Sequence, residues 1–333
     1  MRTAVALFLF RRPEQTGRVF ERIREARPNR LFLIADGPRP GYDEEARECE
    51  RARAGLERID WPCEVVRDFA DENLGLQRRI PSGLDRVFSE VDEAIILEDD
   101  CLPDPSFFPY CDELLERYRD EERIVHVAGS QLLPDPPVAA SYHFSRYAHI
   151  WGWATWRRAW RLFDVDLADW HSQPEEEREA WLRRTFDTDD ERRYWRYVWD
   201  NAPEIDNWDV QWAYVCLARG RLSINPNRNL ISNIGFGDEA TNATVDPLAI
   251  AGRPLEGISF PLQHPSEVRR DVAADASASR LFRRFAPTLR ERLVGGLLRA
   301  GGRALDFVPE PVRPKIRHRD QAGRASSSRG IGR

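Results

Sequence analysis

The feature that most constrains the fold is an alternation, over the first 130 residues, between short apolar runs and longer charged stretches. The apolar runs stand at residues 4–10, 31–34, 64–66, 94–97 and 124–127. Between them lie stretches with helical spacing, such as residues 14–25 and 44–56. Apolar runs of this length predict buried strands. Their alternation with helices predicts an α/β fold with a mostly parallel central sheet flanked by helices.

The composition changes in the second half. Ten of the eleven tryptophans lie between Trp151 and Trp212, among acidic and arginine-rich segments with helical spacing. We expect residues 142–212 to build something other than sheet. Residues 222–225 and 229–231 predict a pair of strands, and residues 234–244 have the glycine and aspartate content of a loop.

The charge distribution limits the partners of the chain. Of the 333 residues 41% are hydrophobic and 32% charged, which excludes collagen, coiled coil and wholesale disorder. The net charge is −6, but residues 280–333 hold 14 basic and 4 acidic residues, so this tail carries +10 and the rest −16. An acidic body argues against broad nucleic-acid binding. The tail has two alternatives: a solvated, disordered extension, or peripheral contact with the anionic inner face of the plasma membrane.

Cysteine usage and hydropathy predict a cytoplasmic protein. The five cysteines form no CxxC pair and no cluster with histidine at zinc spacing. An odd number without such pairs argues against a disulfide framework or a structural zinc site. The apolar run 4–10 is short for a signal peptide, and no run approaches the ~20 apolar residues of a membrane span.

The sharpest motif is the strand at residues 94–97 followed by Glu98, Asp99 and Asp100. Three adjacent carboxylates at a strand end cost free energy unless a cation or hydrogen-bond donors meet them. Carboxylate oxygens suit Mg²⁺ or Mn²⁺, which share their coordination with water and substrate phosphates. The alternative is a solvated acidic turn.

Two further strand ends carry polar residues. Arg11 and Arg12 follow the first predicted strand, and Asp36 follows the second. Ligands of parallel sheets bind at the carboxyl ends of the strands. With the acidic run, these residues therefore predict a site for a metal and a nucleotide.

An ordered set of motifs carries a resemblance over residues 3–265. The set is Asn73-Leu-Gly75, Gly83-Leu84, Glu98-Asp-Asp100, Phe107-Phe108, Ile150-Trp-Gly-Trp153 and Asn207-Trp-Asp209-Val-Gln-Trp212. In this order they resemble glycosyltransferases of the GT-A fold, in particular the N-acetylglucosaminyltransferase I type and bacterial family 2 glycosyltransferases. The acidic run resembles the DxD motif of that fold.

The resemblance implies a metal-dependent inverting glycosyltransferase that moves a sugar from a nucleotide-diphospho-sugar, expected to be a UDP-sugar, to a hydroxyl of a glycan or glycolipid. It implies a catalytic domain at residues 1–270, with a nucleotide part at 1–130 and an acceptor part at 131–270. Residues 271–333 are expected to be a basic, partly disordered extension, because residues 273–279 have linker composition.

The resemblance also implies roles for single residues. These are Asp100 and His264 for the metal, Glu98 and Asp99 for the ribose or donor sugar, Arg11 or Arg12 with Asp36 for the base, Trp151 and Gly152 in the donor site, and Asp209 as the catalytic base. Trp153 and His149 are further candidates for a wall that contacts sugar. Residues 232–241, with two glycines, are a candidate lid.

Asp209 also has a physical argument of its own. An inverting transfer needs one carboxylate to take the proton of the attacking hydroxyl, and the flanking Trp208 and Trp212 would raise its pKa. The alternative is an acidic residue favoured by the dipole at the start of a helix at residues 208–218.

Two other functions stay open. A sugar nucleotidyltransferase would need a glycine-rich, lysine-containing phosphate loop after the first strand, and residues 8–15 contain neither glycine nor lysine. A non-catalytic carbohydrate-binding or assembly protein could keep the same fold without the activity.

Overall fold

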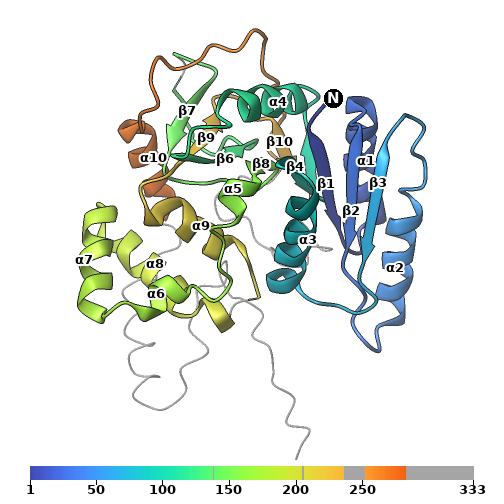
Figure 1. Ribbon diagram of the computed structural model, residues 1–333, viewed down its shortest axis with the longest axis horizontal. Coiled ribbons are helices and arrows are strands. Elements are labelled where there is room, and N and C mark those ends of the chain that lie inside the picture. The colour runs from blue at the N-terminus through green and yellow to red at the C-terminus, as the bar shows by residue number, and fades with distance from the viewer. Residues whose placement is uncertain (138, 205, 236–251, 283–333) are drawn as a thin grey trace, which may run out of the picture.

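The computed structural model describes residues 1–137, 139–204, 206–235 and 252–282. Within these residues eight strands form one sheet in the order β3-β2-β1-β4-β8-β6-β9-β7, with helices on both faces (Figure 1). The predicted α/β class, a central sheet flanked by helices, is confirmed.

The first half of the sheet is parallel. Its strands and the helices that connect them are β1 (Ala4–Leu9), α1 (Pro13–Ala26), β2 (Arg30–Ala35), α2 (Asp43–Ala54), β3 (Glu64–Phe69), α3 (Leu76–Glu90) and β4 (Glu93–Glu98). β1 pairs in parallel with both β2 and β4, and β2 with β3. Alternate residues of β1 enter different cores, because neighbouring side chains of a strand point to opposite faces. Val5 packs with α1 and α2, whereas Phe8 packs with α3.

The second half of the sheet is mixed. It consists of β6 (Ile124–Ala128), β7 (Tyr142–Ser145), β8 (Trp153–Trp156) and β9 (Leu222–Pro226). β8 is antiparallel to β4 and β6, whereas β9 is parallel to β6 and antiparallel to β7. A separate antiparallel pair joins β5 (Cys101–Pro103) to β10 (Ile231–Asn233).

Two expectations about strands were wrong. β7 and β8 lie in the region predicted to avoid sheet; β8 is fully buried between β4 and β6, where tryptophans pack as well as aliphatic residues do. The strand predicted at residues 222–225 forms as β9, whereas the one predicted at residues 229–231 lies two residues further along the chain, as β10. These two strands pair with other strands rather than with each other.

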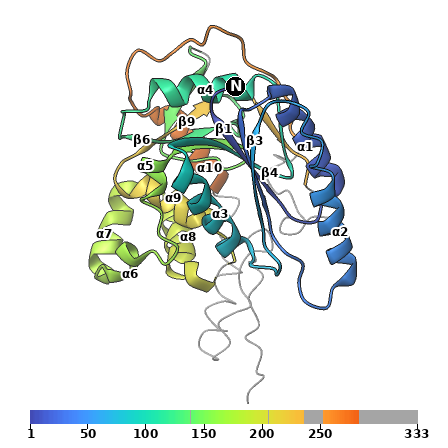
Figure 2. The same cartoon turned by 45° about the vertical axis from the view of Figure 1, so that its right-hand side comes forward.

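The other helices complete the layers. They are α4 (Phe107–Arg117), α5 (Arg157–Trp160), α6 (Ala168–Ser172), α7 (Glu175–Thr185), α8 (Asp189–Asp200), α9 (Asp209–Ala218) and α10 (Val272–Phe282), with a 3₁₀ turn at Ala202–Glu204. Figure 1 shows α6, α7 and α8 together on the side of the molecule opposite β3, and Figure 2 again shows these three helices side by side. They enclose a core rich in aromatic residues, in which Trp170 and Trp199 are fully buried.

α10 replaces the linker predicted at residues 273–279. Ala274 and Ala278, one turn apart, are buried, and the helix lies against β7 and α8. The buried Asp275 accepts a hydrogen bond from Ser145 Oγ at 2.5 Å. Alanine and serine suggested a linker, but small side chains also let a helix approach its neighbours closely.

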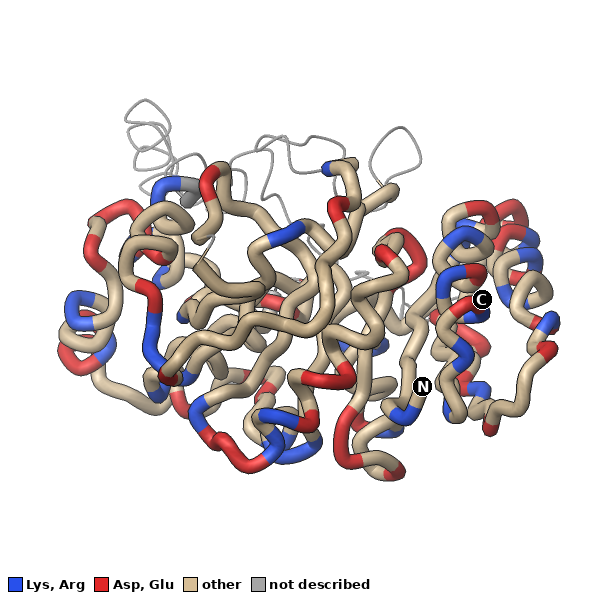
Figure 3. The backbone as a smooth tube through the Cα atoms, turned by 90° about the horizontal axis from the view of Figure 1, so that it is seen from above, with Lys and Arg blue, Asp and Glu red and all other residues tan. Residues whose placement is uncertain are grey.

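The described helices do not provide a membrane span: none is both long and apolar enough. Charged positions lie mainly on the outer helices and loops, while the central strands are largely uncharged (Figure 3). The predicted membrane contact of residues 280–333 falls almost entirely outside the described residues.

Candidate functional site

A cavity of about 330 Å³ opens at the carboxyl ends of β1, β2 and β4. We call it the strand-end cavity. Its polar lining residues are Arg12, Asp36, Arg39, Asn73, Arg79, Glu98, Asp99, Asp100, Asp206, Asn207, Asp209 and Asn233. The structure therefore brings together most of the residues that the sequence predicted for one site, although they come from five separate stretches of the chain.

The acidic run is held by the end of β1. Asp99 Oδ2 accepts from the backbone N–H of Phe10 at 3.0 Å. Arg12 Nη1 lies 3.2 Å from Asp99 Oδ1 and 2.7 Å from Asp100 Oδ2, so one guanidinium spans both carboxylates. Glu98 is the last residue of β4 and pairs in register with Phe8 of β1.

Burial and the crowding of carboxylates shift the pKa values of Glu98 and Asp99. Burial, with the charges of Asp100, Asp99 and Asp209, raises the pKa of Glu98 well above its ordinary range. Burial and the charge of Asp100 also raise the pKa of Asp99, against the opposing effect of Arg12. Burial alone would lower the pKa of Arg12, but the charges of Asp99 and Asp100 raise it. An additional cation in this cavity would stabilise the ionised carboxylates.

Asp36 builds the neighbouring loop. Its Oδ1 accepts from the N–H groups of Gly37 at 2.9 Å and Leu74 at 2.8 Å. Its Oδ2 accepts from Asn73 Nδ2 at 3.0 Å and from the N–H of Gly75 at 3.1 Å. Because a carboxylate offers about four lone-pair sites, these donors occupy the side chain. In this structure Asp36 fixes residues 73–75 at the rim of the cavity.

Three predicted site residues do not line the strand-end cavity. Arg11 turns toward α2, where its Nη1 lies 3.4 Å from Glu48 Oε2. Gly152 has φ +59° and packs where a Cβ would lie 2.4 Å from Ile231 Cδ1, so it allows a close approach of chains. His264 forms a hydrogen bond between its Nδ1 and Tyr142 Oη at 2.9 Å, and its Nε2 lies 3.2 Å from Glu113 Oε1.

Gly235 packs against Asp100 from a distant part of the chain. A Cβ at this position would lie 2.1 Å from Asp100 Oδ2. The segment is fixed by the hydrogen bond from Ile234 N–H to the carbonyl of Asp100 at 2.8 Å. A side chain here would collide with Asp100, so glycine lets this segment pack directly against the carboxylate. The rest of the predicted lid, residues 236–241, lies outside the described residues.

Asp209 is the first residue of α9, the helix predicted at residues 208–218. Asn207 Oδ1 accepts from the N–H of Trp208 at 2.8 Å and so fixes the start of the helix. Burial raises the pKa of Asp209 to about 6. Its Oδ1 is buried and has no hydrogen-bond partner among the described residues. A carboxylate in this state can accept a proton near neutral pH.

A second cavity, of about 220 Å³, adjoins the first. We call it the aromatic cavity. Its lining is Ser130, Leu132, Arg146, Tyr147, Ala148, His149, Ile150, Trp151, Tyr194, Trp195, Asp209, Val210, Trp212, Ala213, Leu217 and Ala278. Ile150, Trp151 and Asp209 line both cavities, so these residues form the boundary between them.

Of the three candidates for a wall that contacts sugar, two line a cavity and one does not. Trp151 and His149 line cavities, whereas Trp153 is 1% exposed and stacks on Trp208 with ring centroids 5.5 Å apart. Trp153 is therefore a core residue.

Sequence reasoning missed Asp206 and Ser130. Asp206 lines the strand-end cavity and its Oδ1 accepts from the N–H of Gln77 at the start of α3, at 3.1 Å. It lies three residues before Asp209 and had a usable signal, because acidic residues favour helix N-termini. Ser130 stands just after β6, in the position where a parallel sheet places its ligands.

Comparisons with known proteins add little. No family model and no curated protein matches the sequence. Among solved structures, UDP-glucose pyrophosphorylase complexed with UDP-glucose aligns with a TM-score of 0.31 and 10% identity over 49% of this chain and 79% of that one. The apo form of UDP-glucose pyrophosphorylase aligns with a TM-score of 0.30 and 9% identity over 49% of this chain and 79% of that one. The 4-diphosphocytidyl-2C-methyl-D-erythritol synthase of Anaerococcus prevotii aligns with a TM-score of 0.33 and 9% identity over 48% of this chain and 74% of that one. TM-scores this low assign no activity.

Proposed function

We propose that the protein is a metal-dependent inverting glycosyltransferase that takes a nucleotide-diphospho-sugar, expected to be a UDP-sugar, as donor and a hydroxyl of a glycan or glycolipid as acceptor. The observation that carries the proposal is the position of Asp209. It lines both cavities, in the first of which it shares the lining with the acidic run of β4. Transfer between two substrates needs a base at the point where they meet.

The donor side of the proposal uses the strand-end cavity. Most of its lining residues belong to residues 1–130, the proposed nucleotide part, and the others come from residues after 131. Arg12, which follows β1, and Arg39, which follows β2, contribute guanidinium groups to its lining. They suit phosphate or base oxygens as charge-assisted donors. Asp36 keeps the 73–75 rim in place for this ligand.

The chemical step assigns the proton to Asp209. The acceptor oxygen attacks the anomeric carbon, and the new C–O bond forms as the bond from that carbon to the diphosphate oxygen breaks. The electron pair leaves with the nucleoside diphosphate, and the acceptor proton moves to Asp209 Oδ1, the buried atom without a partner.

The donor set fits an open metal site rather than a closed one. No group of three or more histidine, cysteine or acidic side chains in the described part of the chain encloses a metal position. Asp100, which lines the strand-end cavity beside the crowded carboxylates of Glu98 and Asp99, is the residue that would hold Mg²⁺ or Mn²⁺ together with substrate phosphates. A bound cation of this kind neutralises charge that develops on the leaving diphosphate. His264, held by Tyr142 and Glu113, lies outside this arrangement.

The proposal is tested with a thermal-shift panel of nucleotide-sugars, with and without Mn²⁺, on the wild type, Asp100→Ala and Asp209→Asn. A ligand that binds only the folded state raises the melting temperature. We expect one donor to raise it in a Mn²⁺-dependent way, the effect to vanish in Asp100→Ala, and Asp209→Asn to bind the donor without releasing nucleoside diphosphate. Binding of no donor would leave a non-catalytic protein as the better description.

A further inference from the structure

The aromatic cavity has its own chemistry, distinct from that of the strand-end cavity. Aromatic and aliphatic side chains make most of its wall, including Trp151, Trp195 and Trp212. Such walls pack against the apolar face of a ring. The strand-end cavity, by contrast, is lined mainly by charged and amide groups.

Two buried side-chain oxygens at this cavity have no hydrogen-bond partner among the described residues. Ser130 is 1% exposed, and its Oγ makes no hydrogen bond within the described part of the chain. Asp209 Oδ1 is likewise buried and makes no hydrogen bond to a described residue. Buried polar atoms left without a partner cost about 1–3 kcal/mol each, so both favour a ligand that brings hydroxyl groups.

The charged and titratable groups facing the cavity do not favour an anion. Burial lowers the pKa of His149 to about 4, so this imidazole is neutral near pH 7. Arg146 donates to the carbonyl of Thr185 and to Tyr147 Oη at 2.7 Å, and its Nη2 lies 3.7 Å from the buried Glu191. The guanidinium is thus neutralised within the protein.

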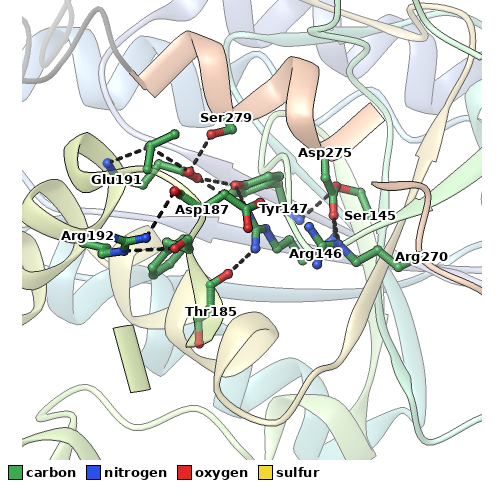
Figure 4. Close-up of polar contacts among 12 residues, drawn as sticks. Ser145, Arg146, Tyr147, Thr185, Asp187, Glu191, Arg192, Arg270, Asp275 and Ser279 are labelled. Atoms are coloured by element: carbon green, nitrogen blue, oxygen red, sulfur yellow. Dashed lines mark hydrogen bonds and ion pairs between the residues drawn. The ribbon is translucent and has the colours of Figure 1, made fainter. Parts of the chain in front are cut away.

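α10 closes the cavity from behind. Ala278 lines it, and polar contacts on both sides of this residue anchor the helix (Figure 4). Asp275 holds Ser145 and Arg270, and Ser279 donates to Glu191. The back wall is therefore fixed, and a volume of about 220 Å³ is below the ~300–1,000 Å³ of pockets for drug-sized ligands. The space suits one small ring.

We propose that the aromatic cavity is the subsite for the acceptor terminus and takes a single uncharged pyranose ring, with one hydroxyl at Asp209 Oδ1 and another at Ser130 Oγ. The acceptor role of this subsite rests on the proposed glycosyl transfer, but the binding of a sugar ring can be tested independently of it. The neutral His149 and the internally paired Arg146 give this subsite no cation for a charged headgroup, a phosphate or a nucleotide.

The test is saturation-transfer NMR with methyl glycosides of glucose, galactose, mannose and N-acetylglucosamine as probes. Four proteins are compared: the wild type, Ser130→Ala, Ala213→Trp, which fills the cavity from α9, and Ala218→Trp as a control on the same helix but outside the cavity lining. We expect at least one methyl glycoside to bind the wild type and Ala218→Trp. We expect binding at least tenfold weaker in Ala213→Trp and several-fold weaker in Ser130→Ala.

The outcomes separate this inference from the proposed function. Absence of binding by every methyl glycoside, or equal binding by the wild type and both cavity variants, overturns the subsite. Should Ala213→Trp unfold, Ser130→Ala decides, because a hydroxyl deletion leaves the packing in place. Sugar binding in the aromatic cavity without any nucleotide-sugar shift in the thermal panel would support the subsite and refute the glycosyl transfer.

Discussion

Replacing Asp209 by asparagine should stabilise the protein while removing its proposed activity. Burial raises the pKa of this carboxyl from its ordinary 3.8 to about 6. The folded chain therefore keeps a proton that the unfolded chain loses between those values. Stability falls as pH rises through this window, since the folded state binds more protons than the unfolded one.

The size of the effect follows from the shift. A change from 3.8 to about 6 is roughly two pKa units, and each unit corresponds to about 1.4 kcal/mol. Asparagine does not titrate, so Asp209→Asn should match the wild type near pH 4 and exceed it by up to about 3 kcal/mol above pH 7. The gain is fully present once the wild-type carboxyl is ionised in both states.

The assay is urea unfolding of both proteins across this pH range without divalent cations. Asp166→Asn, at an exposed aspartate, is the control and should change stability by no more than about 0.5 kcal/mol. A difference between Asp209→Asn and the wild type that stays constant with pH would refute the argument from burial. Transfer in Asp209→Asn should drop by a factor of ~10²–10⁴, and wild-type kcat/KM should rise with pH through about 6.

Two further substitutions test the strand-end cavity. Gly235→Ala would place a Cβ 2.1 Å from Asp100 Oδ2, so nucleotide-sugar affinity measured by calorimetry should fall by roughly tenfold or more, whereas Gly17→Ala, in open space on α1, should leave it unchanged. Unaltered affinity in Gly235→Ala would show that the carboxylate can move freely. Asp36→Asn would turn an amide toward the donors of the 73–75 rim, which should cost about 1–3 kcal/mol in urea unfolding; an unchanged midpoint would contradict the positioning role.

The sequence predicted the strands of the site better than the contacts around them. The run that ends at Glu98 had an unambiguous apolar pattern and became β4. Arg11 and Arg12 are adjacent in sequence, so no pattern could tell that one would turn to α2 and the other to Asp100. That choice depends on Glu48, 37 residues further along the chain.

The errors in the second half have a common physical cause. Long-range contacts decided the structure of β8 and α10, and local composition did not report them. β8 became a strand because β4 and β6 offer free edges on its two sides. α10 became a helix because Ser145 and Arg270 meet Asp275 there. Ser130 was missed for a related reason: its importance lies in what it lines, which only the fold defines.

The charges around the strand-end cavity require a cation before a diphosphate can bind. Among the described lining residues six are acidic and three are arginines, two of which are already paired, Arg39 with Glu45 and Arg79 with Asp68. Arg12 is shared between Asp99 and Asp100, so a doubly charged phosphate group would meet net negative charge.

We therefore expect nucleoside diphosphate binding, measured by calorimetry, to be lost on chelation and restored by Mn²⁺ or Mg²⁺. Asp100→Asn should bind the nucleotide more weakly than the wild type with the cation, yet depend on it less, because one repelling charge is gone. Equal nucleotide affinity with and without a chelator in the wild type would mean that Arg12 leaves the carboxylates for the phosphates and supplies the positive charge alone. In that case Arg12→Ala, and not chelation, would abolish binding.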